Sequence, residues 1–121
     1  NVLRRIKRAN EVMAVEYNLL QKIRADLIEE FNKFLKNNFL IMPTVTIKPP
    51  LVEKCKDSEF YDKANLISLR NTTLANYMNG CSISIPYFEN KEPIGVMLNA
   101  ATNEDDYLLR ISSEIEKVLQ K

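Results

Sequence analysis

The chain has 121 residues, of which 45% are hydrophobic and 27% charged. This is the composition of one small folded domain and excludes a disordered segment. Seventeen Lys and Arg residues against sixteen Asp and Glu residues give a net charge of +1, so the chain has no electrostatic footprint for nucleic acid.

The residue types that carry cofactor chemistry are scarce. The chain has no histidine, and its only cysteines are Cys55 and Cys81, so neither a zinc site nor a disulfide framework is expected. Two glycines cannot build a phosphate-binding loop. We therefore expect no metal or other cofactor, and a reducing cytoplasm as the compartment. No apolar run reaches membrane-spanning length, so no membrane partner is expected.

The first element predicted along the chain is a long helix from Glu11 to Lys36. Apolar residues recur there at spacings of three, four and seven, which predicts an amphipathic helix. The seven-residue recurrence breaks at Arg24 and is too short for a coiled coil. We expect a helix that packs on a sheet and ends at Asn37–Asn38. Its apolar stripe consists of Met13, Tyr17, Leu20, Leu27, Phe31 and Phe34.

A strand is predicted next, over the apolar and β-branched segment Phe39–Ile47. Pro43 lies inside this segment and lacks a backbone N–H, so we expect the strand to weaken or end there. Pro49–Pro50 stops regular structure, and the charged segment Leu51–Asp57 is predicted to be a loop.

Two helical pieces follow this loop. Ser58 or Asp62 is a suitable N-cap for a helix that runs through Arg70. A second, shorter helix is predicted for Thr72–Met78, and Asn79–Gly80 is a turn signal after it.

The last third of the chain predicts two strands and a helix. Apolar residues alternate with Ser and Pro over Cys81–Tyr87, and Ile94–Ala100 forms a second short strand. Thr102 or Asn103 is expected to cap the final helix, whose first turn is acidic, as the helix dipole favours. Its apolar stripe consists of Leu108, Ile111, Ile115, Val118 and Leu119.

These elements predict an α/β fold: short mixed strands covered by a long N-terminal helix and a C-terminal helix. A three-stranded sheet is thin cover for two helices that each have an apolar face. We therefore expect apolar surface that faces something outside the 121 residues, and a homodimer is one possibility.

A self-contained hydrolytic site is not evident in the sequence. Without histidine, Ser–His–Asp and Cys–His arrangements cannot form. Ser82 and Ser84 lie on a predicted strand without a glycine-rich turn, which makes them structural rather than nucleophilic. Cys81 begins the same strand and is expected to be a small buried residue. Adjacent carboxylates such as Glu29–Glu30 and Asp105–Asp106 are expected to be solvated.

The order of several short motifs resembles the C-terminal part of the amidase signature family. LRNTTLANYMNGCSISIP carries the recurring Thr, Asn, Ser and Pro of that family, and the strand opened by PIGVML is similar to its Leu–Pro–Val–Gly strand entry. An earlier helix with a tyrosine and an arginine, and a Pro–Thr strand, complete the series. The matching residues are Tyr17, Arg24, Pro43, Thr44, Thr72, Asn76, Ser84, Pro86, Pro93 and Gly95.

The resemblance implies catalysis by a Ser–Ser–Lys triad that lies N-terminal to the matched region, and no Gly–Ser–Ser string occurs here. Residues 1–121 are thus expected to be the C-terminal segment of an amidase domain, inactive alone, with the missing catalytic part as partner and a small-molecule amide as substrate. Arg70, Asn71 and Thr72 are the candidate substrate-binding residues, and hydrogen bonding at a helix end is the alternative for them. Asn76 is expected to bridge backbone groups of the adjacent turn.

The implied activity is hydrolysis of a carboxylic amide to an acid plus ammonia or an amine. One alternative is a non-catalytic subunit or interaction module. Another is a fragment of the glutamine-dependent tRNA amidotransferase, whose amide-cleaving subunit is a branch of the same family. That branch has an acidic residue where Leu69 stands here, so the resemblance favours a general amidase that prefers neutral amides.

Overall fold

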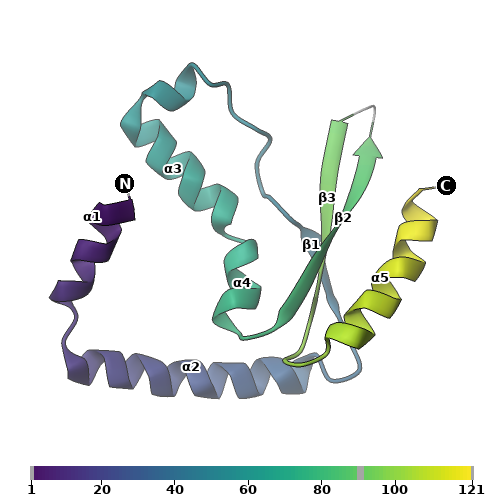
Figure 1. The fold of residues 1–121 in the computed structure, drawn as a ribbon, viewed down its shortest axis with the longest axis horizontal. Helices are drawn as coiled ribbons and strands as arrows, with labels where there is room; N and C mark the ends of the chain where they lie inside the picture. Colours follow the sequence, from purple (N-terminus) through teal and green to yellow (C-terminus); the bar gives the residue numbers. More distant parts are fainter. Residues whose placement is uncertain (1, 90–91, 121) are drawn as a thin grey trace.

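The computed structural model describes residues 2–89 and 92–120 as a small antiparallel sheet with helices at one face, at one end and to one side (Figure 1). The elements in chain order are α1 (Val2–Lys7), the 3₁₀ turn η1 (Arg8–Glu11), α2 (Ala14–Phe34), β1 (Leu40–Pro43), the 3₁₀ turn η2 (Lys54–Lys56), α3 (Ser58–Leu69), α4 (Thr72–Tyr77), β2 (Cys81–Glu89), β3 (Glu92–Ala100) and α5 (Asp105–Leu119).

The sheet has the strand order β1-β3-β2, and both pairings are antiparallel. The α/β fold class is confirmed, although the strands do not run in mixed directions. β3 is central and pairs Asn99 with Leu40 on one side and with Ser82 on the other. As predicted, β1 ends at Pro43, where the missing N–H would interrupt the ladder.

One face of the sheet and α5 form the hydrophobic core. Ile85, Leu98, Ala100 and Leu108 are its buried members. The predicted stripe of the last helix is confirmed for Leu108, Ile111, Ile115 and Leu119, which all belong to or pack on this core, whereas Val118 is 67% exposed. This packing of α5 against β2 and β3 buries a continuous cluster of apolar side chains.

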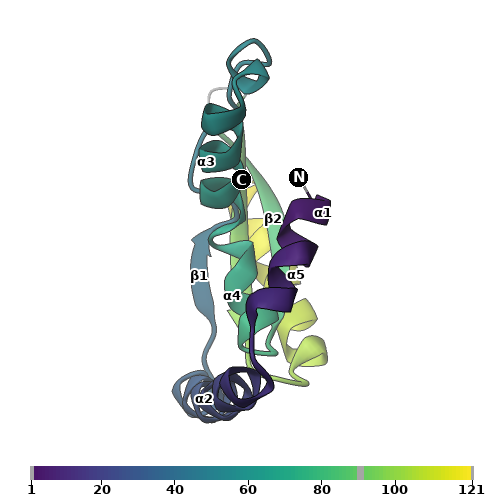
Figure 2. The same ribbon diagram turned by 90° about the vertical axis from the view of Figure 1, so that its left-hand side faces the viewer.

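The long helix α2 is confirmed, but it starts at Ala14, not at Glu11. Met13 is extended, and its N–H donates to the Glu16 carboxylate at 2.9 Å, which caps the helix. α2 lies across the end of the sheet near the start of β2 and does not lie flat on either face (Figures 1 and 2). No residue of α2 is buried, and only Leu35, directly after it, is in the interior.

The residues that cap the other helices differ from those predicted. α3 is capped by Asp57, whose Oδ1 accepts the Phe60 N–H at 2.7 Å, so neither Ser58 nor Asp62 is the cap. Glu104 occupies the N-cap of α5 without a side-chain hydrogen bond. Neither predicted residue caps α5, because Asn103 has a positive φ of 64° and the Thr102 hydroxyl donates to the Asn79 carbonyl.

The predicted turn before β2 is confirmed, with the left-handed residue at Asn79 (φ 53°) rather than at Gly80. Gly80 is needed for a different reason. A Cβ there would lie 2.7 Å from the Ala100 carbonyl oxygen and 3.1 Å from the Phe31 ring. The glycine therefore allows α2 and the end of β3 to approach the start of β2 closely.

Candidate functional site

The predicted binding residues Arg70, Asn71 and Thr72 lie together where α3 meets α4. The Asn71 amide donates to the Pro43 carbonyl at 2.6 Å, and the Thr72 hydroxyl donates to the Leu69 carbonyl at 3.1 Å. Both side chains thus hold this junction together, which is the role of hydrogen bonding at a helix end. Arg70 is exposed, and its guanidinium has no hydrogen bond or ion pair within residues 2–89 and 92–120. It is the one of the three that is free to contact a ligand.

Beside this junction lies an open groove of about 950 Å³ between α3, the segment after β1 and the β2–β3 hairpin. Its walls are mostly apolar, with a few hydroxyl and amide groups among them. The lining residues are Thr44–Pro50, Tyr61, Ala64, Asn65, Ser68, Ser84, Glu89 and Glu92–Gly95. None of the three predicted binding residues lines it, although Ser68 belongs to the same helix end. An apolar groove with few polar groups is the usual form of a small-molecule site.

The groove contains a hydroxyl pair that crosses the central strand. Thr44 follows β1 and Ser84 lies on β2, yet their side-chain oxygens are 2.5 Å apart. This contact is possible because Gly95 of β3 lies between them and has no side chain. A Cβ at position 95 would be 2.5 Å from the Thr44 Oγ1 and 2.9 Å from the Ser84 Oγ. Thr44, Ser84 and Gly95 each match a family motif in the sequence. No sequence pattern predicted that the three residues lie in contact.

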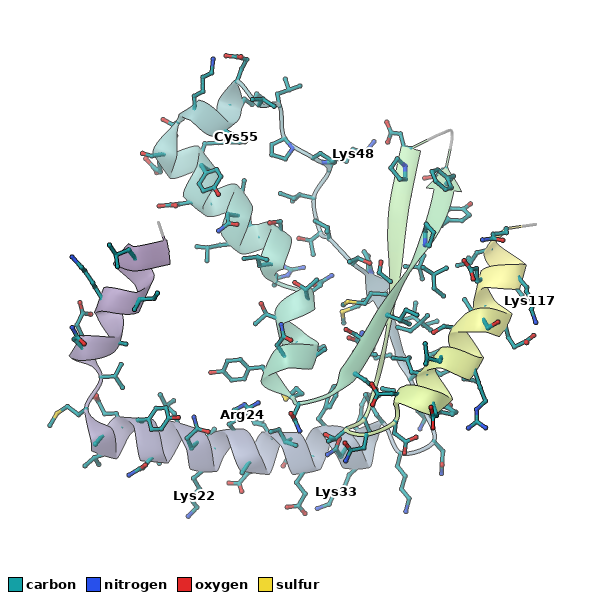
Figure 3. The ribbon with its side chains drawn as sticks, in the orientation of Figure 1. Lys22, Arg24, Lys33, Lys48, Cys55 and Lys117 are labelled. Atoms are coloured by element: carbon teal, nitrogen blue, oxygen red, sulfur yellow. The ribbon has the colours of Figure 1, made fainter. Side chains whose placement is uncertain are left out.

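The rim of the groove carries an ion pair between Lys48 and Glu92, with the Lys48 Nζ 2.6 Å from a carboxylate oxygen. The hydrogen bond to Glu92 and its charge raise the pKa of Lys48, so this amine stays protonated. Both side chains are mostly exposed, and such surface pairs contribute little stability. Lys48 lies on the segment that joins β1 to α3 (Figure 3). The ion pair with Glu92 links this segment to β3.

The serines of β2 do not form a nucleophilic centre. Ser84 shares its hydroxyl hydrogen bond with Thr44, and no histidine exists to activate it. The interpretation of Ser84 as structural agrees with this geometry.

Cys81 has the features of an unreactive thiol. Its Sγ donates to the Ala101 carbonyl at 3.3 Å. Burial raises the pKa of the thiol, and the nearby Asp105 carboxylate raises it further. A thiol in this environment stays protonated at neutral pH and is a poor nucleophile.

The structure does not show the predicted bridge by Asn76. Its side chain is exposed and forms no hydrogen bond with the described part of the chain. Instead, its carbonyl accepts a hydrogen bond of 3.3 Å from Arg24 of α2. The residue therefore contributes its backbone to the contact between α2 and α4.

The described residues contain neither a metal-binding cluster nor a helix that could span a membrane. No group of three or more His, Cys, Asp or Glu side chains there could hold a metal ion. None of the helices among these residues combines the length and apolar character that crossing a bilayer requires.

Comparison with known proteins identifies the family of this chain. The family model described as Amidase matches residues 1–109. The chain is 28% identical to the 2-amino-5-chloromuconic acid deaminase of Comamonas testosteroni over 121 residues, which cover 95% of this chain and 26% of that protein.

A solved structure has the same fold. The crystal structure of a glutamyl-tRNA(Gln) amidotransferase subunit from Thermotoga maritima superposes with a TM-score of 0.62 at 24% sequence identity. The match covers 90% of this chain and 25% of that one. The chain thus spans about a quarter of the length of each of these two proteins.

Proposed function

This chain belongs to the amidase family, and from that membership we propose that it is the C-terminal part of an amidohydrolase. The enzyme cleaves a carboxylic amide to an acid plus ammonia or an amine, through a Ser–Ser–Lys triad outside these 121 residues. The observation that carries the proposal is the family match over residues 1–109. The missing catalytic part of the amidase fold is the partner that this proposal requires.

What the chain contributes to the enzyme follows from its geometry. The described residues hold no activated nucleophile, so their role is to build one wall of the substrate site. The junction at Arg70 and the groove beside it supply this wall. The groove suits an uncharged apolar portion of the amide because its walls are mostly apolar, and Lys48 pairs with one of its two carboxylates, Glu92.

Arg70 is proposed to bind an anionic group of the substrate, since its guanidinium is exposed and lacks an acidic partner in the described chain. The name of the Comamonas testosteroni relative supports a small organic acid as substrate and ammonia as product. Two free cysteines support a reducing cytoplasm as the place where the enzyme works.

The test is ammonia release from simple aliphatic and aryl amides, measured for the 121-residue chain and for the full-length protein encoded by its gene. We expect turnover only from the full-length protein. Ammonia release by the chain alone that vanishes in a Ser84→Ala variant would show that the nucleophile lies here and would defeat the proposal.

The binding role of Arg70 is separated from a structural role by a matched pair of variants of the full-length enzyme. Arg70→Ala should raise KM for an acidic amide at least about tenfold, the loss of roughly one charge-assisted hydrogen bond, and leave the melting temperature unchanged. Asn71→Ala should lower the melting temperature, because it removes the bond to the Pro43 carbonyl. An unchanged KM in Arg70→Ala would remove Arg70 from the site.

The second candidate function is a non-catalytic interaction module. The observation that favours it is the lack of a nucleophile and base within the described residues. A full-length protein without amide turnover that still binds a partner protein stably would support this alternative over the amidohydrolase.

A further inference from the structure

Four serine and threonine hydroxyls of the described residues line the groove beside α3, and they differ in how their hydrogen atoms are used. The Thr46 hydroxyl donates to the Ile67 carbonyl at 2.9 Å. The Ser68 hydroxyl donates to the backbone carbonyl three residues before it, also at 2.9 Å. The hydroxyls of Thr44 and Ser84 form their only hydrogen bond within the described chain with each other.

The Thr44–Ser84 pair has one hydrogen atom left to donate. Each hydroxyl has one hydrogen and two lone pairs, and the 2.5 Å bond between the two oxygens uses a single hydrogen, whichever atom donates it. The second hydrogen has no acceptor among the described residues. A hydroxyl that accepts one hydrogen bond is polarised and donates the next one more strongly. The pair is therefore a strong donor with an unused hydrogen.

This unused donor lies in the groove together with a second unused polar group. Thr44, Ser84 and Gly95 all line the groove, and the Ser84 side chain is exposed. On the wall formed by α3, Asn65 is half-buried, and its side-chain amide forms no hydrogen bond with the described chain. The few polar groups of a mostly apolar groove are the ones that fix the orientation of a ligand. These two groups are thus suited to contact a ligand from two walls.

The charges and hydrogen atoms of the groove favour a neutral oxygen as the acceptor. An ammonium group has no lone pair for the unused hydroxyl hydrogen. A carboxylate would enter a groove that already contains Glu89 and Glu92, of which Glu92 is paired with Lys48. A carbonyl, ether or hydroxyl oxygen accepts the hydrogen bond without bringing a charge among apolar side chains.

We propose that Thr44 and Ser84 act together as one hydrogen-bond donor that selects amide substrates with a neutral oxygen in the part of the molecule that occupies the groove. The proposal rests on the proposed function, because it takes the groove as a wall of the substrate site. The Asn65 amide supplies the second polar contact, from the wall formed by α3. The pair orients the substrate and takes no part in bond cleavage, since the proposed triad lies outside these 121 residues.

The experiment measures kcat/KM of the full-length protein encoded by the gene of this chain. The substrates are hexanamide and analogues in which an ether oxygen replaces one methylene at successive positions along the acyl chain. This exchange adds a hydrogen-bond acceptor with little change in shape. The measured quantity is the ratio of kcat/KM for an ether analogue to kcat/KM for hexanamide. Comparison of this ratio between variants cancels any intrinsic difference in reactivity between the two substrates.

The decisive variant combines Thr44→Val with Ser84→Ala, because either hydroxyl alone would still have a hydrogen to donate. For at least one ether analogue, the ratio should be at least about fivefold lower in this double variant than in the unsubstituted protein. The melting temperature should stay nearly unchanged, since exchange of both partners for apolar groups of similar shape is close to neutral. Thr44→Ser keeps the hydroxyl and should keep the ratio. Ser82→Ala, on the same strand but outside the groove, is the control and should also keep it.

Equal ratios in the double variant and in Ser82→Ala, for every ether analogue, would overturn the proposal. The melting temperature would then identify the acceptor of the unused hydrogen. A clear fall in the double variant, without one in Ser82→Ala, would place this acceptor in the catalytic part of the fold and not in the substrate.

Amide turnover by the unsubstituted protein tests the proposed function separately. Turnover with a ratio that the double variant leaves unchanged would retain the amidohydrolase and reject the donor pair. If no amide is hydrolysed, binding of the same compounds is measured by isothermal titration calorimetry. Tighter binding of an ether analogue that the double variant abolishes would retain the donor pair and reject the amidohydrolase. Equal binding of hexanamide and all its analogues would reject both.

Discussion

At the scale of single residues, Gly95 is a position of the sheet where any side chain would clash with its neighbours. Thr44 and Ser84 belong to segments on opposite sides of β3, and their hydroxyls meet above the glycine at 2.5 Å. The Thr44 N–H also donates to the Gly95 carbonyl at 2.8 Å. These contacts draw the chain after β1 over the hairpin and so shape the groove.

Gly95→Ala should destabilise the chain by about 1–3 kcal/mol, since the new methyl group would overlap Thr44 and Ser84 and force both to move. Chemical denaturation of the 121-residue chain measures this. Ser82→Ala, at an exposed position of the same hairpin, is the matched control and should stay within about 0.5 kcal/mol. Equal stability of the two variants would contradict the crowding at Gly95.

Cys81 is the second residue whose chemistry the fold alters. Burial and the Asp105 carboxylate disfavour the thiolate, so the pKa of Cys81 is raised. The folded state therefore holds the proton more tightly than the unfolded state does. This stabilisation is fully present below the ordinary thiol pKa and is lost as pH rises through the raised pKa of the folded state.

In a Cys55→Ser variant, alkylation by iodoacetamide reports on Cys81 alone. The reaction at pH 8.5 should be slower than that of glutathione, and its rate should rise at a higher pH than it does for glutathione, because only the thiolate reacts. The same variant unfolded in urea serves as control and should react like the free thiol. A folded protein that reacts as fast as glutathione would exclude a partly buried thiol that stays protonated.

At the scale of elements, α2 depends on a few polar contacts because it buries none of its own residues. The Arg24 bonds attach its middle to α4. Near its C-terminus, the Asn32 Oδ1 accepts the Thr102 N–H at 3.0 Å and the Asn32 amide donates to the Thr102 hydroxyl at 3.2 Å. The N-terminal half of the helix has no comparable attachment to the sheet among the described residues.

Arg24→Met keeps the length and apolar stem of the side chain but removes its donors. We expect faster amide hydrogen exchange over α2 and α4 and a loss of roughly 1–2 kcal/mol, typical of hydrogen bonds from a charged group. Lys22→Met, on the opposite face, is the control and should leave exchange in α4 unchanged. Exchange in Arg24→Met that matched the unsubstituted chain would mean that the Arg24 bonds do not hold the two helices together.

At the scale of the whole molecule, the small core explains why much apolar surface is left exposed. α5 covers one face of the sheet, the opposite face is buried at Met97 and Asn99 of the central strand, and α2 lies at the sheet's end. The sheet also has two edge strands, β1 and β2, since β3 lies between them. Unpaired strand edges and uncovered helix faces are features that a larger domain closes by further pairing and packing.

The substrate preference of the full-length protein is a prediction at this scale. Leu69 is the last residue of α3, is 45% exposed and directly precedes Arg70. The amidotransferase branch of the family has an acidic residue there to hold the amino group of glutamine, and leucine offers neither charge nor hydrogen bond for an ammonium. Turnover of an aliphatic amide that lacks the ammonium group of glutamine should therefore exceed that of glutamine in kcat/KM. A clear preference for glutamine would assign the protein to the amidotransferase branch.

The sequence by itself determined most of the elements, but α1 and the two 3₁₀ turns were not predicted. Period-two alternation predicted β2, and the spacing of apolar residues predicted α2 and α5, because these patterns depend only on local geometry. Residues that end strands and helices could be predicted for the same reason. Pro43 ends β1 because it has no N–H to donate, and Asn37 and Asn79 adopt positive φ at helix ends because asparagine tolerates it.

The family could also be recognised from the order of its short motifs. The spacing of the motifs reflects the order of the elements and does not depend on the contacts of any one residue. The same motifs could not distinguish a binding role from a structural one for Arg70, Asn71 and Thr72. That distinction depends on Pro43, which lies 28 residues before Asn71 and accepts its amide hydrogen bond.

Only the tertiary structure decided where the elements meet. Periodicity shows that α2 has apolar residues at helical spacing, but not that Phe31 lies beside Gly80 while Met13, Tyr17 and Leu20 stay exposed. The Thr44–Ser84 pair, the groove and the Arg24 contacts each join segments about 20 to 50 residues apart. Contacts at such separations depend on strand register and on the path of the chain, which local patterns do not encode.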